Sequence, residues 1–565
     1  MESQWYIYNK KKLAFELSEK YGISKLLSII LCNRNIDTEY ETKMMLSNDI
    51  DDLNDEKLLP DVDKACDILH QYIETNKSIR IVGDYDIDGI CSTFIIYEAL
   101  KSIGANVSYD IPDRIYDGYG INYSIVDKAI NDRIDLIITC DNGIAAEDQI
   151  DYAIKNNIEV IVTDHHDVSS VPNSAVAVIN PKREDLKIKY PFKEICGAVV
   201  AFKFLLRYFD KFKNNRQYII DSFLEFAMLA TIGDIMPLVN ENHILVKLGL
   251  IKIKNTKNKG LKSLLLVSDL DNKDITPYYI GYIIGPLINA AGRMDKATIV
   301  LKLLLSNDDK EINEITNKLK DLNNERKSLT EEGLKKTVEL IENKYKNDKV
   351  FVIYVDGLKE QVAGIVAGRI KEMYYKPTII LTSTINDNEA KASCRSIEQY
   401  DIYNALNQFN NMFVKFGGHK LAAGFSILKK DIDILRKNLN ENCTLSEEDF
   451  VPKVYIDLEF PCYSFNIKHI EELEKLEPFG KGFEKPIFVS KDVKAQIVNI
   501  YGENKNVVKL RLLKDEHYSQ GLAFTDSKVL MDRLQDNSNI DILYYPKINN
   551  YMGKQSLEFN IIDYR

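Results

Sequence analysis

Short apolar segments alternate with longer segments of helical periodicity between residues 78 and 179, and this alternation constrains the fold more than any other feature. The apolar segments are Ser78–Gly83, Val107–Asp110, Ile134–Thr139, Ile158–Thr163 and Ala175–Ile179. A strand that is buried on both faces has a nearly continuous apolar sequence, and helical crossovers join parallel strands. The pattern therefore predicts an α/β fold in which helices cover both faces of a parallel sheet.

The rest of the chain predicts several further domains, as a length of 565 residues allows. Residues 1–60 predict a mostly helical lead-in, and residues 61–295 form the α/β domain. Residues 296–346 are highly charged and carry apolar residues at helical spacing, which predicts linker helices. Residues 347–447 repeat an α/β pattern on a smaller scale. Residues 448–565 contain strand-like segments separated by turns, which predicts a small β-barrel.

Composition leaves a wide range of functions open. The formal net charge of -11 counts mildly against a nucleic-acid partner, but phosphate contacts need only a local basic groove. The eight cysteines form no C-x-x-C pair and indicate reduced thiols rather than a zinc site or a disulfide framework. The sequence lacks an apolar run of about 18 residues and a signal-peptide core, so we expect a cytoplasmic protein without membrane spans.

Acidic and imidazole side chains directly follow three of the predicted strands. They are Asp84, Asp86 and Asp88 after the first strand, Asp141 after the third, and Asp164, His165 and His166 after the fourth. The carboxyl ends of parallel strands meet at one edge of a sheet, so these groups should converge. Crowded carboxylates repel one another unless cations neutralise them, and oxygen ligands mixed with imidazole suit Mn²⁺ or Mg²⁺. One aspartate after a strand is usually a helix N-cap, whereas this convergence favours a two-metal phosphodiesterase site.

These segments resemble the motifs of the DHH phosphoesterase superfamily, namely Gly83–Gly89, Cys140–Gly143, Asp164-His165-His166 and Gly233-Asp234. Further segments resemble the RecJ family of single-strand-specific 5′→3′ exonucleases. These are Pro112–Arg114, Gly118–Gly120, Gly285–Arg293, Gly364–Arg369, Lys391–Ser396, Gly417–His419, Ala422–Gly424 and Leu476–Gly480. The resemblance extends from about Trp5 to the C-terminus.

The resemblance implies a role for each matching residue. The implied metal ligands, with Asp141 shared between two Mn²⁺ or Mg²⁺ ions, are Asp84, Asp86, Asp88, Asp141, His165 and Asp234. Asp164 is implied to orient His165, and His166 to contact the scissile phosphate. The implied DNA contacts, including those to a terminal 5′-phosphate, are Arg114, Tyr119, Arg293, Ser393, Arg395, Gly417, Gly418 and His419.

The resemblance also implies an architecture and an activity. A DHH domain, a linker helix, a DHH-associated domain and an OB-like barrel should enclose a cleft that admits one strand. The implied reaction is stepwise 5′→3′ hydrolysis of single-stranded DNA to mononucleotides in recombination and repair, by a monomer that works with single-strand-binding protein and a helicase. The sequence departs from the family pattern at Leu358-Lys359, which puts one DNA contact in doubt, and at Gly482-Phe483, which has a structural character.

Two other functions remain possible on the sequence alone. One is a DHH enzyme for oligoribonucleotides, cyclic dinucleotides or pyrophosphate, but such small substrates need neither a long linker nor a barrel. The other is a non-catalytic DNA-binding replication scaffold, against which the complete set of acids argues. In the predicted barrel, several aromatic residues lie among lysines and fit either base stacking or the barrel core, namely Tyr501, Phe524, Tyr544, Tyr545 and Tyr551.

Overall fold

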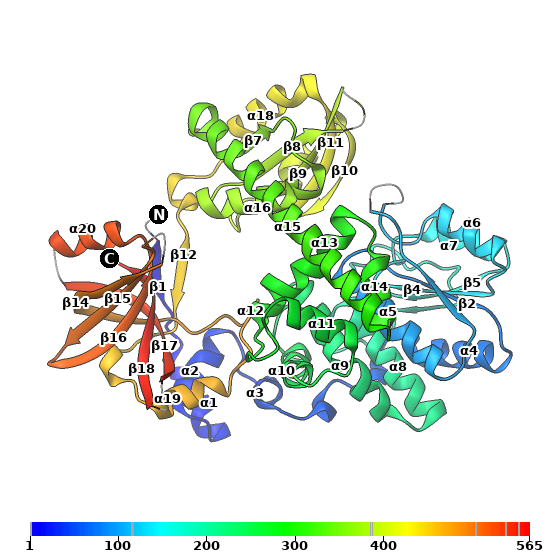
Figure 1. Ribbon diagram of the computed structural model, residues 1–565, viewed down its shortest axis with the longest axis horizontal. Helices are drawn as coiled ribbons and strands as arrows, with labels where there is room; N and C mark the ends of the chain where they lie inside the picture. The colour runs from blue at the N-terminus through cyan, green and yellow to red at the C-terminus, as the bar shows by residue number, and fades with distance from the viewer. Residues whose placement is uncertain are drawn as a thin grey trace.

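The computed structural model describes residues 3–114, 118–384, 386, 388–502, 505–536, 539–551 and 554–565. In Figure 1 the first α/β domain lies on the right, the second α/β domain at the top and the barrel on the left. A long helix, α15 (Asp309–Leu340), joins the first two domains. Strand β12 (Lys453–Ile456) descends from the second domain towards the barrel.

The first domain contains five parallel strands in the order β3-β2-β4-β5-β6, which confirms the predicted α/β class. The strands are β2 (Ile79–Val82), β3 (Val107–Asp110), β4 (Leu136–Cys140), β5 (Glu159–Thr163) and β6 (Ala177–Ile179). One face packs on α4 (Val62–Glu74), α5 (Ile87–Ser102), α8 (Gly197–Lys213) and α9 (Arg216–Gly233). The other face packs on α6 (Tyr123–Asn131) and α7 (Glu147–Lys155). Both faces are therefore buried, as the apolar strand sequences require.

A helical layer follows the sheet and leads into the linker. It contains α10 (Glu241–Ile253), α11 (Lys259–Val267), α12 (Pro277–Tyr279), the π-helix η3 (Ile280–Ile284), α13 (Gly285–Met294) and α14 (Thr298–Leu305). Helices α12, η3 and α13 form one uninterrupted rod. Helix α15 packs against α11, α13 and α14, and then against α16 (Glu360–Tyr374) of the second domain. The linker is thus packed on both domains.

The second domain has a mixed five-stranded sheet in the order β10-β11-β9-β8-β7. Its strands are β7 (Phe351–Tyr354), β8 (Thr378–Ser383), β9 (Glu389–Arg395), β10 (Phe413–His419) and β11 (Ala422–Leu428). Only β7 and β8 are parallel, and they are the two strands that the apolar pattern predicts. Strands β9 to β11 are rich in alanine, glycine and serine, which weakens their strand signal.

Five strands close the C-terminal barrel, which is completed by the pairing of β14 with β17. They are β14 (Phe488–Tyr501), β15 (Val507–Lys514), β16 (His517–Phe524), β17 (Asn539–Tyr551) and β18 (Lys554–Tyr564). Tyr544 and Tyr545 are buried in the barrel, Phe524 is exposed, and the side chain of Tyr551 lies outside the described residues.

The N-terminal lead-in belongs to the same core as the barrel. Helices α1 (Lys11–Tyr21) and α2 (Lys25–Asn33) pack into it, and β1 (Gln4–Ile7) pairs with β12. Arg34 and Asp457 form a buried ion pair of 2.6 Å across this contact. Among the helices that the structure describes, none has the length and apolar character needed to cross a membrane.

Candidate metal centre and nucleic-acid cleft

Four chain segments bring acidic and imidazole groups to the carboxyl edge of the first sheet. Asp84 follows β2, and Asp86 caps the N-terminus of α5 by accepting the amides of Asp88 and Gly89. Asp141 follows β4 with a left-handed φ of 62°, a region that Asp and Asn tolerate better than most residues. His165 follows β5, and Asp234 ends α9.

His165 lies at the centre of this cluster. Its Nε2 is 3.1 Å from a carboxylate oxygen of Asp141, 3.6 Å from one of Asp88 and 3.7 Å from one of Asp234. His166 adds an Nδ1 atom 3.8 Å from Asp141. Two overlapping groups can each hold a cation with ligand atoms within 4.8 Å of one another, namely Asp88, His165 and Asp234, and Asp141, His165 and His166. His165 is common to both groups, and Asp141 is the carboxylate nearest to its Nε2.

Several polar atoms of the cluster are buried without a hydrogen-bond partner among the described residues. They are Oδ2 of Asp84, Oδ1 of Asp141 and Nδ1 of His165. Buried polar atoms are nearly always paired, so free lone pairs at one place are unusual. Hard divalent cations take oxygen ligands, and Mn²⁺ also accepts imidazole. The donor set therefore fits divalent metal ions.

Asp88 also anchors the helical layer. Its two carboxylate oxygens accept the amides of Gly197 and Ala198, each at 2.7 Å, at the N-terminus of α8. An anion there is stabilised by the helix dipole. The close approach is possible because a Cβ at Gly197 would lie 2.6 Å from the Cβ of Asp141. Glycine at this position lets the helix start directly against the proposed metal ligands.

Asp164 holds His166 rather than the ring of His165, which differs from the expected arrangement. One carboxylate oxygen of Asp164 accepts the amide of His165 at 2.7 Å and lies 2.8 Å from Nδ1 of His166. The backbone turns sharply after β5, so the second imidazole, not the first, faces this carboxylate. The hydroxyl of Tyr119 lies 3.2 Å from the same His166 nitrogen and also donates to the carbonyl of Asp141. His166 is thus held between Asp164 and Tyr119.

The crowded carboxylates have strongly altered proton affinities. Burial, followed by the charge of Asp86, raises the pKa of Asp84 to about 8. Burial, followed by the charge of Asp88, raises the pKa of Asp234 to about 8, and burial also raises the pKa of Asp141. Although burial alone would lower it, the hydrogen bond to Asp164 raises the pKa of His166 to about 9. Bound cations would lower the pKa values of these carboxyls again.

These shifts predict a pH-dependent stability without metal. In the native state the carboxyls of Asp84 and Asp234 keep a proton up to about pH 8. In the unfolded chain the same carboxyls have their ordinary pKa of 3.8 and lose the proton above that pH. The free energy of unfolding should therefore fall as pH rises from about 4 to about 8, because the native state binds more protons. Mn²⁺ should restore it most at high pH, where metal binding displaces fewest protons.

Melting temperatures at several pH values, in EDTA and in Mn²⁺, would check this expectation. Asp234→Asn should flatten the pH dependence in EDTA, because it removes one of the shifted groups. The exposed Asp127→Asn serves as a control that should leave it unchanged. A melting temperature that rose with pH in EDTA would contradict the assignment of protonated carboxyls.

Arginines from both domains and the linker gather beside the metal centre. Burial, followed by the charges of Arg114, Arg326 and Arg395, lowers the pKa of Arg293 to about 10. The Arg293 guanidinium donates to the carbonyl of Gln361 in α16 at 3.2 Å. The sequence resemblance identified Arg293, Arg114 and Arg395. It missed Arg326 of α15, which is 9% exposed and is oriented by the amide oxygen of Asn323.

The predicted residues of the second domain face this arginine cluster. Ser393 and Arg395 lie on β9, and a Cβ at Gly364 of α16 would lie 3.3 Å from the Arg395 guanidinium. Asp167 follows His166 in the chain, and the charges of Lys182 and His419 lower its pKa. His419, at the end of β10, therefore lies near Asp167. Gly418 lies where a Cβ would be 2.5 Å from the carbonyl of Ala422. Cationic groups of both α/β domains therefore lie beside the metal centre.

One residue of each departure from the family pattern is buried, whereas Lys359 and Gly482 are exposed. Leu358 is buried against α15 and α16, beside Gly333. Phe483 is fully buried, stacks on Phe479 and packs edge-on against His243 of α10. His243 is buried with its ring between the first domain and the segment that leads into the barrel. Leu358 and Phe483 thus strengthen contacts between domains.

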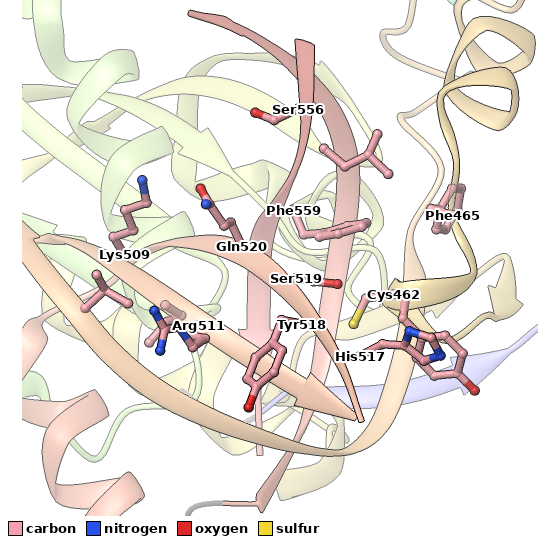
Figure 2. Close-up of a pocket in the computed structure, with 14 residues that line it drawn as sticks. Cys462, Phe465, Lys509, Arg511, His517, Tyr518, Ser519, Gln520, Ser556 and Phe559 are labelled. Carbon is pink, nitrogen blue, oxygen red and sulfur yellow. The ribbon is translucent and has the colours of Figure 1, made fainter. Parts of the chain in front are cut away.

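A pocket of about 750 Å³ opens on the barrel. Its aromatic lining includes Tyr463 and His517, whose rings stack at 5.0 Å, and Tyr518. Figure 2 shows Lys509 and Arg511 on one side of this pocket and His517 near Cys462 on the other. Stacking surfaces next to cations are the features that bind single strands without sequence preference. The sequence predicts a mixture of aromatic and basic residues in the barrel, but at positions other than these.

The backbone beside Asp234 is strained. Ile235 has a left-handed φ of 56° and is 64% exposed. It occupies the position after the helix cap in a Schellman turn, where the amide of Met236 donates to the carbonyl of Thr231 at 3.0 Å. Glycine is usual at that position, and another residue costs roughly 1–2 kcal/mol. A β-branched residue in this conformation is an outlier, and such strained residues cluster at functional sites.

Comparison with known proteins agrees with this geometry. The DHH family N-terminal domain matches residues 78–231, the DHHA1 domain residues 347–444 and the RecJ OB domain residues 456–563. The fold, together with a carboxylate and imidazole cluster at the sheet edge, defines a hydrolase with DHH and DHHA1 domains.

The relatives are more specific. The chain is 31% identical to the single-stranded-DNA-specific exonuclease RecJ of Bacillus subtilis (strain 168), over 97% of this chain and 69% of that protein. It is 30% identical to RecJ of Escherichia coli (strain K12), over 89% of this chain and 90% of that one. The chain therefore belongs to the RecJ family.

Two solved structures are similar. RecJ from Thermus thermophilus in complex with Mn²⁺ shares the fold, with a TM-score of 0.82 and 24% identity over all of this chain and 79% of that one. An exonuclease RecJ bound to manganese has a TM-score of 0.59 and 29% identity, over 69% of this chain and 96% of that one.

Proposed function

We propose that this protein hydrolyses single-stranded DNA stepwise from its 5′ end, releasing mononucleotides, with two divalent metal ions as cofactors. The observation that carries the proposal is the convergence of unpaired carboxylate and imidazole atoms at one sheet edge, beside arginines without carboxylate partners among the described residues. A recombination and repair role, a cytoplasmic location, a monomeric state and cooperation with single-strand-binding protein and a helicase are parts of the same proposal and rest on the family.

The metal ions would be held by Asp84, Asp86, Asp88, Asp141, His165 and Asp234, with Asp141 shared between the two ions. When bound, such ions neutralise phosphate charge and activate water for in-line attack. The chain itself supplies the rest of the site. His166, whose pKa is raised to about 9, carries a positive charge at neutral pH. It can donate a charge-assisted hydrogen bond to a phosphate oxygen while Asp164 fixes its ring.

The proposed 5′ polarity rests on the arginine cluster. Arg293 and Arg395 lie on opposite walls, and neither has a carboxylate within ion-pair distance among the described residues. A buried guanidinium without a counter-ion is costly, so an anionic ligand is the natural partner. Guanidinium groups fork onto phosphate oxygens, which suits a terminal phosphate held one nucleotide from the metals.

An assay with three substrates tests the proposal. A labelled single strand with a 5′-phosphate, a dinucleotide and pyrophosphate are each incubated with Mn²⁺ or EDTA. We expect metal-dependent release of mononucleotides from the single strand at a much higher rate than from the two small substrates. Preferred cleavage of the dinucleotide or of pyrophosphate would favour the small-substrate DHH enzymes. Strand binding without hydrolysis in Mn²⁺ would favour a scaffold.

The barrel pocket should contribute to strand binding through charge. Deleting the barrel would also expose the core that it shares with α1 and α2, so side-chain variants are the better test. Replacing both Lys509 and Arg511 with glutamine should lower the salt dependence of single-strand affinity. Each lost phosphate contact reduces the slope of log K against log salt by roughly 0.7.

Fluorescence anisotropy with a single strand at increasing salt measures this slope. Lys528→Gln, on α20 (Ser527–Asp536), removes a charge outside the pocket and should leave the slope unchanged. An unaltered slope in the folded double variant would show that the pocket binds something other than the DNA backbone.

A further inference from the structure

Two tyrosines stand exposed at the start of the rod formed by α12, η3 and α13. Tyr278 is 61% exposed and Tyr282 is 72% exposed. Their rings stack on each other, with centroids 4.9 Å apart and planes at 26°. Two large rings side by side form a contiguous exposed aromatic surface, and the π-helical turn that carries Tyr282 is a feature frequent at functional sites.

Three features lie one after another along this rod. Arg293, in the arginine cluster, lies near its C-terminal end. Four residues earlier, the side chain of Asn289 accepts the amide of Ile87, in the loop of Asp86 and Asp88, at 2.8 Å. Tyr282 lies another seven residues earlier, which is roughly 10 Å along the rod at the usual helical rise. The tyrosines and the arginine cluster are therefore on opposite sides of the metal centre.

The tyrosine pair is also next to the strained turn at Ile235. A Cβ at Gly281 would lie 3.7 Å from the side chain of Ile232, so η3 packs directly on the end of α9. That end of α9 provides Asp234 and the exposed Ile235. An exposed apolar side chain in a strained conformation therefore directly follows a proposed metal ligand, at the end of the helix on which η3 packs.

A groove of about 470 Å³ continues from Tyr278 towards the barrel. One side is formed by α10 and α12, and the other by the segment that leads into β14. Its charged lining is balanced, with Lys247, Lys254 and Lys485 beside Asp274, Glu474 and Glu477. In Figure 1 helix α12 lies on the side of the first domain that faces the barrel. The tyrosines are therefore between the metal centre and the barrel.

We propose that Tyr278, Tyr282 and Ile235 form a stacking platform for the bases on the 3′ side of the scissile phosphate. The inference rests on the proposed exonuclease function and adds the path of the strand. A 5′-phosphate at the arginine cluster and a scissile phosphate at the metals would place the second and third bases over these side chains. Every base has an apolar face, so the platform would not select sequence.

Stacking can be measured without hydrolysis. A twelve-nucleotide single strand with a 5′-phosphate carries one 2-aminopurine at position 2, 3 or 10, and EDTA prevents cleavage. We expect binding to quench the probe at positions 2 and 3. Tyr282→Ala should abolish this quenching and weaken binding roughly tenfold, the usual size of one base contact. Tyr123→Ala, an exposed tyrosine on the distant helix α6, should have neither effect.

Ile235→Gly separates a functional role from a structural one. Glycine adopts the left-handed conformation freely, so the melting temperature should stay the same or rise. Strand binding should nevertheless weaken, and KM for the single strand should rise more than kcat falls. A stable variant with unchanged binding and unchanged KM would remove Ile235 from the platform.

The outcomes distinguish this inference from the function on which it rests. If the wild type degrades single strands but shows no quenching at positions 2 and 3, the platform is wrong and the exonuclease assignment stands. If the wild type quenches the probes but releases no mononucleotide in Mn²⁺, the platform stands and the proposed reaction fails. Equal quenching by wild type and Tyr282→Ala would also overturn the platform.

Discussion

Replacing Asp141 by asparagine should lower the rate of single-strand hydrolysis by a factor on the order of 10³ or more, the scale expected when a central electrostatic group is lost. Oδ1 of Asp141 lies 3.1 Å from Nε2 of His165 and is buried without a hydrogen-bond partner among the described residues, so it is free to bind a cation. Asparagine tolerates the φ of 62°, whereas alanine would add backbone strain. Single-turnover hydrolysis of a 5′-phosphorylated strand in Mn²⁺ measures the effect.

Asp127→Asn provides the matched control. Asp127 is an exposed residue of α6, and its carboxylate accepts a hydrogen bond from the hydroxyl of Tyr152 on α7. The Asp127→Asn variant should hydrolyse single-stranded DNA at the wild-type rate. Near wild-type hydrolysis by a folded Asp141→Asn would contradict the two-metal assignment, because no shared ligand could be lost without a large effect.

Replacing Arg395 by alanine should raise KM for 5′-phosphorylated strands by roughly 10- to 150-fold. That range corresponds to one hydrogen bond to a charged group, about 1.5–3 kcal/mol. The effect falls mainly on KM because the terminal phosphate is held alike in the ground and transition states. The preference for 5′-phosphate over 5′-hydroxyl ends should shrink by the same factor. Steady-state rates on both kinds of end give this ratio.

The control for Arg395 is a residue of the same β-strand. Lys391 of β9 has the same charge, but its ammonium is paired with Glu360 at 2.5 Å. Lys391→Ala should leave the ratio between the two ends unchanged. An unaltered ratio in Arg395→Ala would eliminate the terminal-phosphate pocket. Digestion that begins at 3′ ends would eliminate the proposed polarity as well.

Much of the fold could be predicted from local patterns. Strands β2, β4 and β5 are continuous apolar runs, and the residues that follow them, Asp84, Asp141 and His165, converge because parallel strands end at one edge. The strands of the second sheet that are rich in small residues, β9 to β11, could not be predicted in this way. Their stability comes from pairing and burial rather than from side-chain preference.

Local sequence patterns were enough to predict the class of fold, the strand ends at which the acids collect, and the family to which the motifs belong. Those features depend on residues close together in the chain, where the period of apolar residues and the strand-to-helix turn act directly. The folded chain was needed to learn that Asp164 holds His166, that Arg326 of the linker joins Arg293, and that the π-helix η3 packs on the end of α9. These arrangements result from packing between distant segments, whose free energy depends on complementary surfaces that no local period encodes.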